Sequence, residues 1–107
     1  MLSEQTLREA ARLLGEEAGR AKVILFGSYA RGEADDGSDA DFLVIEPEVE
    51  NRAAEMVRLY RALARTGIPA DILVYSEADV DRRKDWTSSA VHWALKEGKL
   101  LYESTRV

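Results

Sequence analysis

Three short apolar runs, each long enough for a strand, constrain the fold of this chain more than any other feature. They are VILF at residues 23–26, FLVI at residues 42–45 and ILVY at residues 72–75. Apolar residues at consecutive positions put apolar side chains on both faces of an extended chain, because successive side chains point to opposite faces. We therefore expect strands of a sheet that is covered on at least part of both faces.

Segments with helical spacing of apolar residues lie around these runs. The first is expected to run from a Ser3 cap to about Arg20, and its apolar stripe consists of Leu7, Ala10, Ala11, Leu14 and Ala18. The second covers residues 50–66 and stops before Gly67 and Pro69. Its apolar face is predicted to hold Ala53, Met56, Val57, Tyr60 and Leu63 or Ala64.

The last third of the sequence carries two further helix signals. Ser76, with Asp79 three residues on, has the pattern of a capping box and predicts a short helix. Thr87 or Ser88 is predicted to cap a final helix that ends at Gly98. The LLY that follows, residues 100–102, is predicted to be either an edge strand or a packed tail.

The order of elements is therefore helix, strand, loop, strand, helix, strand, helix, helix. This order predicts the α/β or α+β class, with a small mixed β-sheet and helices packed on it. A chain of 107 residues has room for one hydrophobic core, so residues 1–107 are expected to form a single domain. The same length leaves no room for a separate domain that binds an acceptor substrate.

Composition narrows the class of function. The formal net charge is −5, and an acidic surface repels polyanions, so direct binding of nucleic acid is not expected. The sequence contains no cysteine, which excludes disulfides and thiolate metal sites. No signal peptide and no apolar run of the roughly 20 residues that span a bilayer can be recognised. We expect a cytoplasmic protein without membrane contact.

The segment GSYARGEADDGSDAD, residues 27–41, carries the strongest chemical pattern. Asp39 and Asp41 are two positions apart where a strand begins, so their side chains should share one face, with Cα atoms about 7 Å apart. Two like charges so close repel unless a cation lies between them. Mg²⁺ suits the pair because it binds one or two carboxylates together with phosphate oxygens and water.

A third acid extends this pattern. Asp71 begins the third apolar run, and it would join Asp39 and Asp41 if its strand lies beside the second strand. Three acids on one face of a sheet form the arrangement that two-metal phosphoryl chemistry uses, in which one ion orients a triphosphate and the other lowers the pKa of the attacking hydroxyl.

The beginning of the same segment has features of a phosphate site. Gly27 follows the first apolar run and lets the backbone approach a ligand. Residues 28–31 are predicted to start a helical turn whose free N–H groups face a phosphate, and Ser28 adds a hydroxyl donor. Arg31 adds a positive charge, directed either to phosphate or to the acids at residues 33–36.

Each of these signals has an ordinary structural interpretation as well. A Gly-Ser pair after a strand is usually a turn, and an Asp-x-Asp in a loop more often caps or stabilises a turn. The acids Glu33, Asp35 and Asp36 are expected to be solvated loop residues without a further role. The combination is what distinguishes this sequence from a polar hairpin.

That combination resembles a known superfamily. Gly27-Ser28, ten further residues, Asp39-x-Asp41 and a later strand acid at Asp71 are similar to the pattern of the polymerase-beta-like nucleotidyltransferases. The short length, the wording GSYARG…SDAD and the segment ALKEGKLLYE at residues 94–103 resemble the minimal nucleotidyltransferases, the MNT antitoxins of HEPN–MNT toxin–antitoxin pairs. The resemblance covers nearly the whole chain.

The resemblance implies roles for particular residues. Gly27 and Ser28 would hold the nucleotide triphosphate, Asp39 and Asp41 would bind Mg²⁺, and Asp71 would complete the metal site and help to activate the acceptor hydroxyl. Two Mg²⁺ ions are implied when nucleotide is bound, and the implied donor is ATP. The implied reaction is transfer of AMP to a tyrosine hydroxyl of the HEPN toxin, an RNase that is thereby silenced, within a hetero-oligomer.

Two other functions remain open at this point. The chain could neutralise a toxin by binding alone, with a vestigial site, although the complete set of acids argues against such decay. Alternatively, the acceptor of nucleotidyl transfer could be a small molecule or an RNA end, bound with the help of a homodimer.

Several residues outside the segment have mainly structural interpretations. His92 is predicted to serve packing or the surface rather than catalysis. Trp86, Trp93 and Tyr102 are expected to fill the core or to form an apolar patch for a partner. The basic cluster at residues 82–84 is expected to be a solvated helix end.

Overall fold

The computed structural model describes residues 1–104 of the 107, and within them a four-stranded mixed sheet forms the centre of the molecule. The strands are β1 (Ala21–Phe26), β2 (Ala40–Glu46), β3 (Ala70–Ser76) and β4 (Lys99–Ser104), in the spatial order β3-β2-β1-β4. β1 pairs antiparallel with β2 and with β4, whereas β2 and β3 are parallel. The predicted mixed sheet is confirmed, and residues 100–102 belong to an edge strand.

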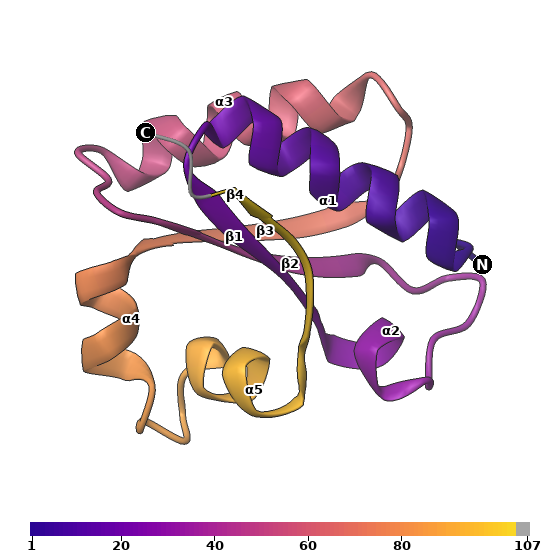
Figure 1. Cartoon of the computed structure of the whole chain (residues 1–107). Coiled ribbons are helices and arrows are strands. Elements are labelled where there is room, and N and C mark those ends of the chain that lie inside the picture. The colour runs from indigo at the N-terminus through magenta and orange to yellow at the C-terminus, as the bar shows by residue number, and fades with distance from the viewer. Residues whose placement is uncertain (105–107) are drawn as a thin grey trace.

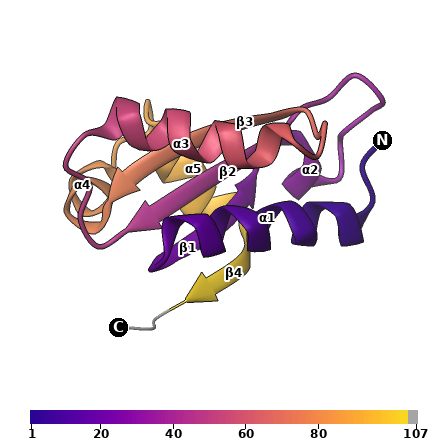
Figure 2. The same ribbon diagram turned by 90° about the horizontal axis from the view of Figure 1, so that it is seen from above.

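Helices lie on both faces of this sheet, as the three apolar runs predict (Figures 1 and 2). They are α1 (Glu4–Ala18), α2 (Gly27–Arg31), α3 (Arg52–Ala64), α4 (Glu77–Arg83) and α5 (Ala90–Glu97). The long helices α1 and α3 lie side by side over one face, and the shorter helices α2, α4 and α5 lie on the other face. Among residues 1–104, no helix combines the length and the apolar character needed to cross a membrane.

The larger part of the core lies between the sheet and the α1/α3 layer. Even-numbered residues of β2 and β3 point into it, as Phe42 and Ile72 illustrate, and both are at most 1% exposed. The predicted stripe of α1 packs onto this face, and its buried members are Leu7, Ala10, Ala11 and Leu14. α1 begins at a Ser3 cap that accepts a hydrogen bond from the Thr6 N–H, as expected, and ends at Ala18 before Gly19.

A smaller core fills the other face. Odd-numbered residues of β2, among them Leu43 and Ile45, pack with Val80 of α4 and with Val91 and Ala94 of α5. Because β2 contributes to both cores, residues 42–46 of β2 are all buried. Alternation along this strand therefore decides on which face of the sheet each of its polar residues emerges.

Two details of the helices differ from the sequence-based expectation. The predicted apolar face of α3 was partly wrong: Ala53 and Val57 are exposed, and the buried residues are Leu59 and Leu63. The cap of α5 is Ser89, whose hydroxyl accepts a hydrogen bond from the Val91 N–H, rather than Thr87 or Ser88. The predicted cap of α4 is confirmed, because the Ser76 hydroxyl accepts a hydrogen bond from the Asp79 N–H.

Side chains of α3 cover the free edge of β3. The Ile72 N–H donates a hydrogen bond of 2.8 Å to the hydroxyl of Tyr60, and Nε of Arg52 donates one of 2.7 Å to the Val74 carbonyl. Exposed edge strands invite pairing with other chains, and such contacts satisfy the edge locally. Tyr60 is thus a side chain of the sheet edge, which explains why it is 38% exposed instead of lying in the core.

Candidate active site

The parallel pairing of β2 and β3 brings two of the predicted acids together. Asp41 and Asp71 are direct partners in the register of these strands. Cα atoms of paired residues in neighbouring strands are about 4.8 Å apart, and their side chains project from the same face of the sheet. The condition on which the role of Asp71 depended, a third strand beside the second, is met.

The two acids emerge on the face that carries α4 and α5. Asp41 alternates with Leu43 and Ile45, which belong to the smaller core, and Asp71 alternates in the same way with Leu73 and Tyr75. Both acids stand at the beginning of their strands, and Asp41 lies next to the end of β1, where it pairs with Phe26. This is also the point at which α2 begins.

Asp39 lies just outside β2, two residues before Asp41, and it is exposed. The chain is fixed beside it, because the Ala40 N–H donates a hydrogen bond of 3.0 Å to the Pro69 carbonyl, at the start of β3. Asp39 is near enough to Asp41 for its charge to act on that carboxyl group. The three predicted acids therefore share one corner of the sheet.

The pKa of Asp41 records this crowding. Partial burial raises it above the ordinary value, and the negative charges of Asp71 and Asp39 raise it further, whereas the positive charge of Arg31 acts in the opposite direction. A carboxylate whose charged form is opposed by two neighbouring carboxylates would gain from a bound cation. Carboxylate oxygens are also the donors that Mg²⁺ prefers.

The carboxylate oxygens of these three acids are suitable ligands for Mg²⁺, but their present positions do not form a complete metal site. Among residues 1–104, no group of three or more His, Cys, Asp or Glu side chains is gathered closely enough to hold a metal ion. Asp41 and Asp71 are adjacent through the register of the strands, and Asp39 is attached one residue before the first of these strands. The three-carboxylate metal site stays a prediction.

Gly27 lies directly against the side chain of Asp41. Its φ angle is +73°, a conformation that favours glycine, and a Cβ atom at this position would overlap the carboxylate of Asp41. The backbone of Gly27 and the Asp41 carboxylate thus lie against each other without an intervening side chain. The approach of this backbone to a ligand stays a prediction; within the chain, the group that it approaches is the Asp41 carboxylate.

Ser28 lies in the predicted helical turn, which is α2. The first N–H groups of any helix have no partner within the helix, so those of Gly27 and Ser28 are available to a ligand. The Ser28 hydroxyl forms no hydrogen bond with any residue in the range 1–104, while its carbonyl accepts one from the Glu33 N–H. These donors lie next to the acids, as a triphosphate bound through Mg²⁺ would require.

Arg31 follows the second of its two predicted alternatives. Its Nε donates a hydrogen bond of 2.9 Å to Glu33, and its guanidinium lies 4.0 Å from Glu97 of α5. The side chain therefore links α2 to α5 while contributing positive charge near Asp41. A role in nucleotide binding stays a prediction. Glu97, which helps to place Arg31, was not found from the sequence, because a Glu at the end of a helix has no distinctive pattern.

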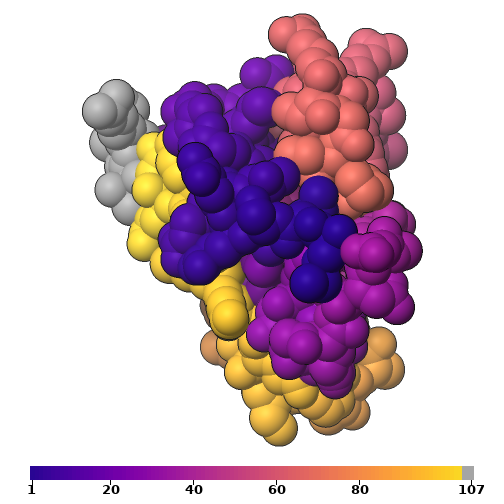
Figure 3. Space-filling view, turned by 90° about the vertical axis from the view of Figure 1, so that its right-hand side faces the viewer, coloured from indigo at the N-terminus to yellow at the C-terminus, as the bar shows by residue number. Residues whose placement is uncertain are grey.

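The first residues of the chain contact α2 and the loop that follows it (Figure 3). The Met1 ammonium group pairs with Asp36 at 2.8 Å, and the Leu2 N–H donates a hydrogen bond of 3.0 Å to the hydroxyl of Tyr29. Tyr29, within the motif, therefore supports the loop that leads to Asp39 and packs against the larger core. Asp36, which was expected to be merely solvated, has a partner.

The remaining residues that the sequence singled out lie away from the acids. The Nδ1–H of His92 donates a hydrogen bond of 2.8 Å to the Lys84 carbonyl, which is a structural contact between the end of α4 and α5. The Trp93 indole N–H donates one of 2.8 Å to the Thr87 carbonyl, and Trp86 is 51% exposed. Arg83 stacks over Tyr75 and Trp86, so the basic cluster is only partly solvated.

Comparison with known proteins agrees with this geometry. The family described as "Nucleotidyltransferase domain" matches residues 7–103. A protein of Methanocaldococcus jannaschii that is named as a candidate protein adenylyltransferase is 31% identical over 104 residues, which are 95% of this chain and all of that protein.

Solved structures show the same fold. A chain from a toxin–antitoxin complex solved with AMP-PNP has a TM-score of 0.60 and 19% identity, over 92% of this chain and 74% of that one. A chain from the complex of the tri-AMPylated Shewanella oneidensis HEPN toxin with its MNT antitoxin has a TM-score of 0.52 and 18% identity, over 94% and 73%. At such identities, the likeness concerns the fold.

Proposed function

The chain belongs to the nucleotidyltransferase domain family and is a nucleotidyltransferase, and on that premise we propose that it transfers AMP from ATP to a tyrosine hydroxyl of a partner HEPN-domain RNase. In this proposal it acts in the cytoplasm as the antitoxin of a toxin–antitoxin pair. The transfer requires Mg²⁺, and one domain, residues 1–107, provides the whole nucleotide site.

One observation carries the reaction class: Asp41 and Asp71 are paired in register, and the backbone of Gly27 lies directly against Asp41. A strand pair with two carboxylates beside a glycine that opens a helical turn joins a metal-binding half to a phosphate-binding half. A turn with a purely structural role needs neither the paired carboxylates nor a glycine backbone in contact with one of them.

The residues divide the chemistry between them. Asp39 and Asp41 would hold Mg²⁺, and Asp71 would complete the site and stand next to the acceptor hydroxyl. When bound, the metal neutralises charge on the triphosphate and lowers the pKa of the attacking hydroxyl. Gly27 and Ser28 would bind the phosphates through their N–H groups and the Ser28 hydroxyl, with Arg31 adding positive charge.

The transfer conserves atoms and charge. The tyrosine oxygen forms a bond to the α-phosphorus of ATP, and the bond between that phosphorus and the oxygen of the β-phosphate breaks. Pyrophosphate leaves, and the hydroxyl proton passes to the Asp71 carboxylate or to solvent. In this proposal the acceptor is carried by a partner protein that provides its own binding surface.

The choice of acceptor is supported by relatives. The M. jannaschii protein is named for transfer to protein, and the S. oneidensis complex contains a HEPN toxin that carries AMP groups. The complex with AMP-PNP, an analogue of ATP, supports ATP as the donor. A HEPN protein is therefore a more specific candidate acceptor than a small molecule or an RNA end.

The test is the intact mass of a purified HEPN-domain partner after incubation with the chain, ATP and Mg²⁺. We expect mass gains in steps of one AMP, and we expect them to disappear with EDTA or with the double variant Asp39→Ala, Asp41→Ala. The double variant Glu48→Ala, Glu50→Ala removes the same charge from exposed positions and should label the partner at the wild-type rate.

Two results would contradict the proposal in different ways. Labelling by the Asp39→Ala, Asp41→Ala variant at the wild-type rate would show that the metal assignment is wrong. If the wild-type chain binds the partner and suppresses its RNase activity without any change of mass, the chain neutralises by binding alone.

A further inference from the structure

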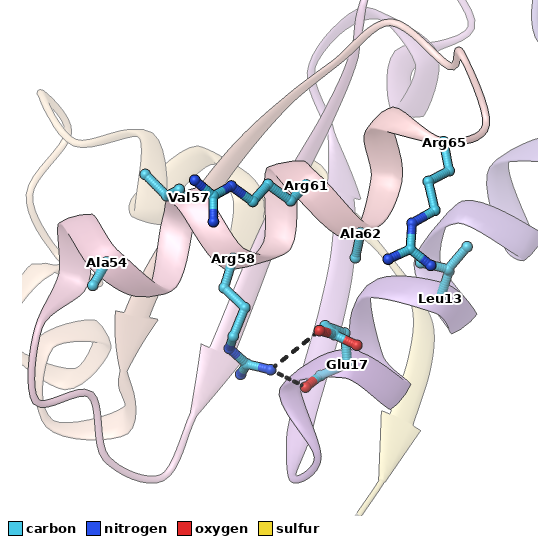
Figure 4. Close-up of a pocket in the computed structure, with 8 residues that line it drawn as sticks. All are labelled: Leu13, Glu17, Ala54, Val57, Arg58, Arg61, Ala62 and Arg65. Carbon is cyan, nitrogen blue, oxygen red and sulfur yellow. Dashed lines mark hydrogen bonds and ion pairs between the residues drawn. The ribbon is translucent and has the colours of Figure 1, made fainter.

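A large hollow lies between α1 and α3, on the opposite face of the sheet from Asp41 and Asp71 (Figure 4). It has a volume of about 730 Å³ and is lined by Leu13, Glu17, Ala54, Val57, Arg58, Arg61, Ala62 and Arg65. We call it the α1–α3 groove. Four of the lining residues are apolar or small, three are arginines and one is Glu17.

The arginines form one row of α3. Arg58, Arg61 and Arg65 follow one another at helical spacing and all line the groove; Arg58 and Arg65 point toward α1, whereas Arg61 extends along α3 toward Val57 (Figure 4). This row is basic although the protein as a whole has a net charge of −5. Arginines three and four residues apart repel one another, so the row is not explained by the stability of α3 itself.

Among residues 1–104, the first of these arginines is the one that has acidic partners. Arg58 donates hydrogen bonds to Glu55 at 2.9 and 2.7 Å, and its guanidinium lies 3.5 Å from a carboxylate oxygen of Glu17 on α1. Arg61 and Arg65 form no ion pair and no side-chain hydrogen bond with any residue in the range 1–104. Two guanidinium groups thus face the groove with their charge uncompensated.

The groove also offers an apolar contact. Val57 of α3 is 50% exposed and lines the groove together with Leu13 of α1 and the small residues Ala54 and Ala62 of α3. Val57 is one of the residues that its sequence pattern assigned to the core. A single exposed apolar side chain is common on a protein surface, so Val57 contributes to a docking site only together with the neighbouring arginines.

We propose that the α1–α3 groove binds an acidic amphipathic helix of a partner protein. Apolar side chains of that helix would cover Val57 and Leu13, and its carboxylates would pair with Arg61 and Arg65, whose guanidinium groups bind carboxylates in a bidentate manner. α3 has 13 residues, so the groove offers about 20 Å, enough for some four turns of a docked helix.

Nucleic acid fits this surface less well than a protein helix. Proteins that bind nucleic acid commonly neutralise about 6–10 phosphates, whereas only Arg61 and Arg65 are uncompensated here. Glu17 lines the same groove, and the net charge of −5 repels an extended polyanion. A helix with one acidic face and one apolar face could pair with the arginines and also cover the apolar residues of the groove.

This surface is independent of the transfer reaction. α1 and α3 pack on the face of the sheet that holds Phe42 and Val44, while Asp41 and Asp71 emerge on the other face. A helix in the groove would therefore leave the acids accessible, and the proposal stands even if the chain proves catalytically inactive.

The test measures the fluorescence anisotropy of a fluorescein-labelled helical peptide of leucine and glutamate, about 14 residues long to match the groove. We expect wild-type protein to bind it, and the double variant Arg61→Glu, Arg65→Glu to bind about tenfold more weakly or worse, because charge-assisted pairs are the strong ones. The single variant Val57→Asp should also weaken binding. Far-UV circular dichroism verifies that each variant is folded.

The matched control is the double variant Arg20→Glu, Lys99→Glu, which changes the net charge by the same amount at exposed positions outside the groove. We expect it to bind the peptide nearly as well as wild type. Equal loss in both double variants would overturn the proposal, because net charge alone would then explain binding. So would tighter binding of a single-stranded RNA probe, or no peptide binding at all.

A second copy of the chain is the remaining occupant to exclude. Sedimentation velocity of the wild-type protein alone should give one species whose size does not change with concentration. Concentration-dependent dimers that the Arg61→Glu, Arg65→Glu variant abolishes would assign the groove to self-association instead of a partner helix.

Discussion

Replacing Glu46 by glutamine should make the protein more stable in alkaline solution than the wild type. Glu46 ends β2, is 7% exposed, and faces the α1/α3 side of the sheet, where its Oε2 atom has no hydrogen-bond partner among residues 1–104. Burial and the neighbouring carboxylate of Glu55 raise its pKa from 4.5 to about 8. Glu55 keeps its negative charge because it pairs with Arg58, which lowers its pKa.

The sign of the effect follows from this raised pKa. Below pH 4.5, Glu46 is protonated in both the folded and the unfolded chain. Between pH 4.5 and about 8, the unfolded chain loses the proton while the folded chain retains it, so the free energy of unfolding falls as the pH rises. The stabilisation is therefore complete in acid and lost above pH 8. Glutamine carries no titrating proton and can still donate a hydrogen bond to Glu55.

The magnitude can be bounded. A pKa difference between 4.5 and about 8 corresponds to at most about 5 kcal/mol, at 1.36 kcal/mol per pKa unit. Glu46 lines a hollow that water can enter, so solvent screening reduces the effect to about 2 kcal/mol. In a domain of this size, 2 kcal/mol corresponds to a change of about 8–16 °C in Tm.

The assay is urea unfolding at pH 5, 7 and 9, followed by circular dichroism, with the midpoint and the slope fitted separately. The stability of Glu46→Gln relative to wild type should increase by about 2 kcal/mol from pH 5 to pH 9. Residue 46 is the only difference between the two proteins, so the change of their stability difference with pH reports the carboxyl group of Glu46 and its coupling to Glu55. A difference that stays constant with pH, or that decreases, would refute the reasoning. Glu48→Gln, at an exposed position beside the same hollow, should show no such trend.

Three other predictions concern particular contacts. Gly27→Ala should abolish most transfer activity, because the added Cβ displaces Asp41. The control is Gly32→Ala, since Gly32 also has a positive φ but nothing lies within 4 Å of an added Cβ. This control should lose only about 1 kcal/mol of stability and keep the wild-type transfer rate in the mass assay. Tyr60→Phe should destabilise the chain by about 1 kcal/mol and speed hydrogen exchange of the Ile72 amide, which loses its acceptor. Arg31→Ala should raise the KM for ATP more than it lowers kcat; an unchanged KM would restrict Arg31 to its contacts with Glu33 and Glu97.

The strands and their faces could be predicted because they depend on local alternation. The period of two along FLVI places Asp41 on the face opposite to Phe42 without any knowledge of the rest of the chain. The same rule gave Asp39 and Asp41 a shared direction. Pairing is a different matter, because the partner of Asp41 is thirty residues away in sequence, and only the parallel register of β2 and β3 makes it Asp71. From the sequence, the role of Asp71 depended on whether β3 lies beside β2, and the sequence alone could not show that it does.

The face of α3 could not be predicted for a related reason. Both Val57 and Leu59 are apolar, and the spacing of Ala53, Met56, Val57 and Tyr60 is as regular as that of Met56, Leu59 and Leu63. What decides between them is the neighbouring structure: α3 must turn Tyr60 toward the edge of β3, where the Ile72 N–H needs an acceptor. That choice leaves Val57 exposed and directs Arg58 and Arg65 toward α1, so one non-local hydrogen bond helps to create the groove.

The two ends of β2 show how one strand can bury two carboxyl groups under different constraints. Asp41 and Glu46 are five positions apart, so alternation sends them to opposite faces of the sheet. Burial raises the pKa of both. Glu46 faces α3, beside a carboxylate that Arg58 already neutralises, and a proton is the simplest compensation there. Asp41 faces the corner of the sheet that also holds Asp71, Asp39 and the Gly27 backbone, where a divalent cation would offset part of the crowded negative charge. If the proposed function is correct, Asp41→Asn should abolish transfer and Glu46→Gln should leave it intact, which separates the two ends of the strand in one assay.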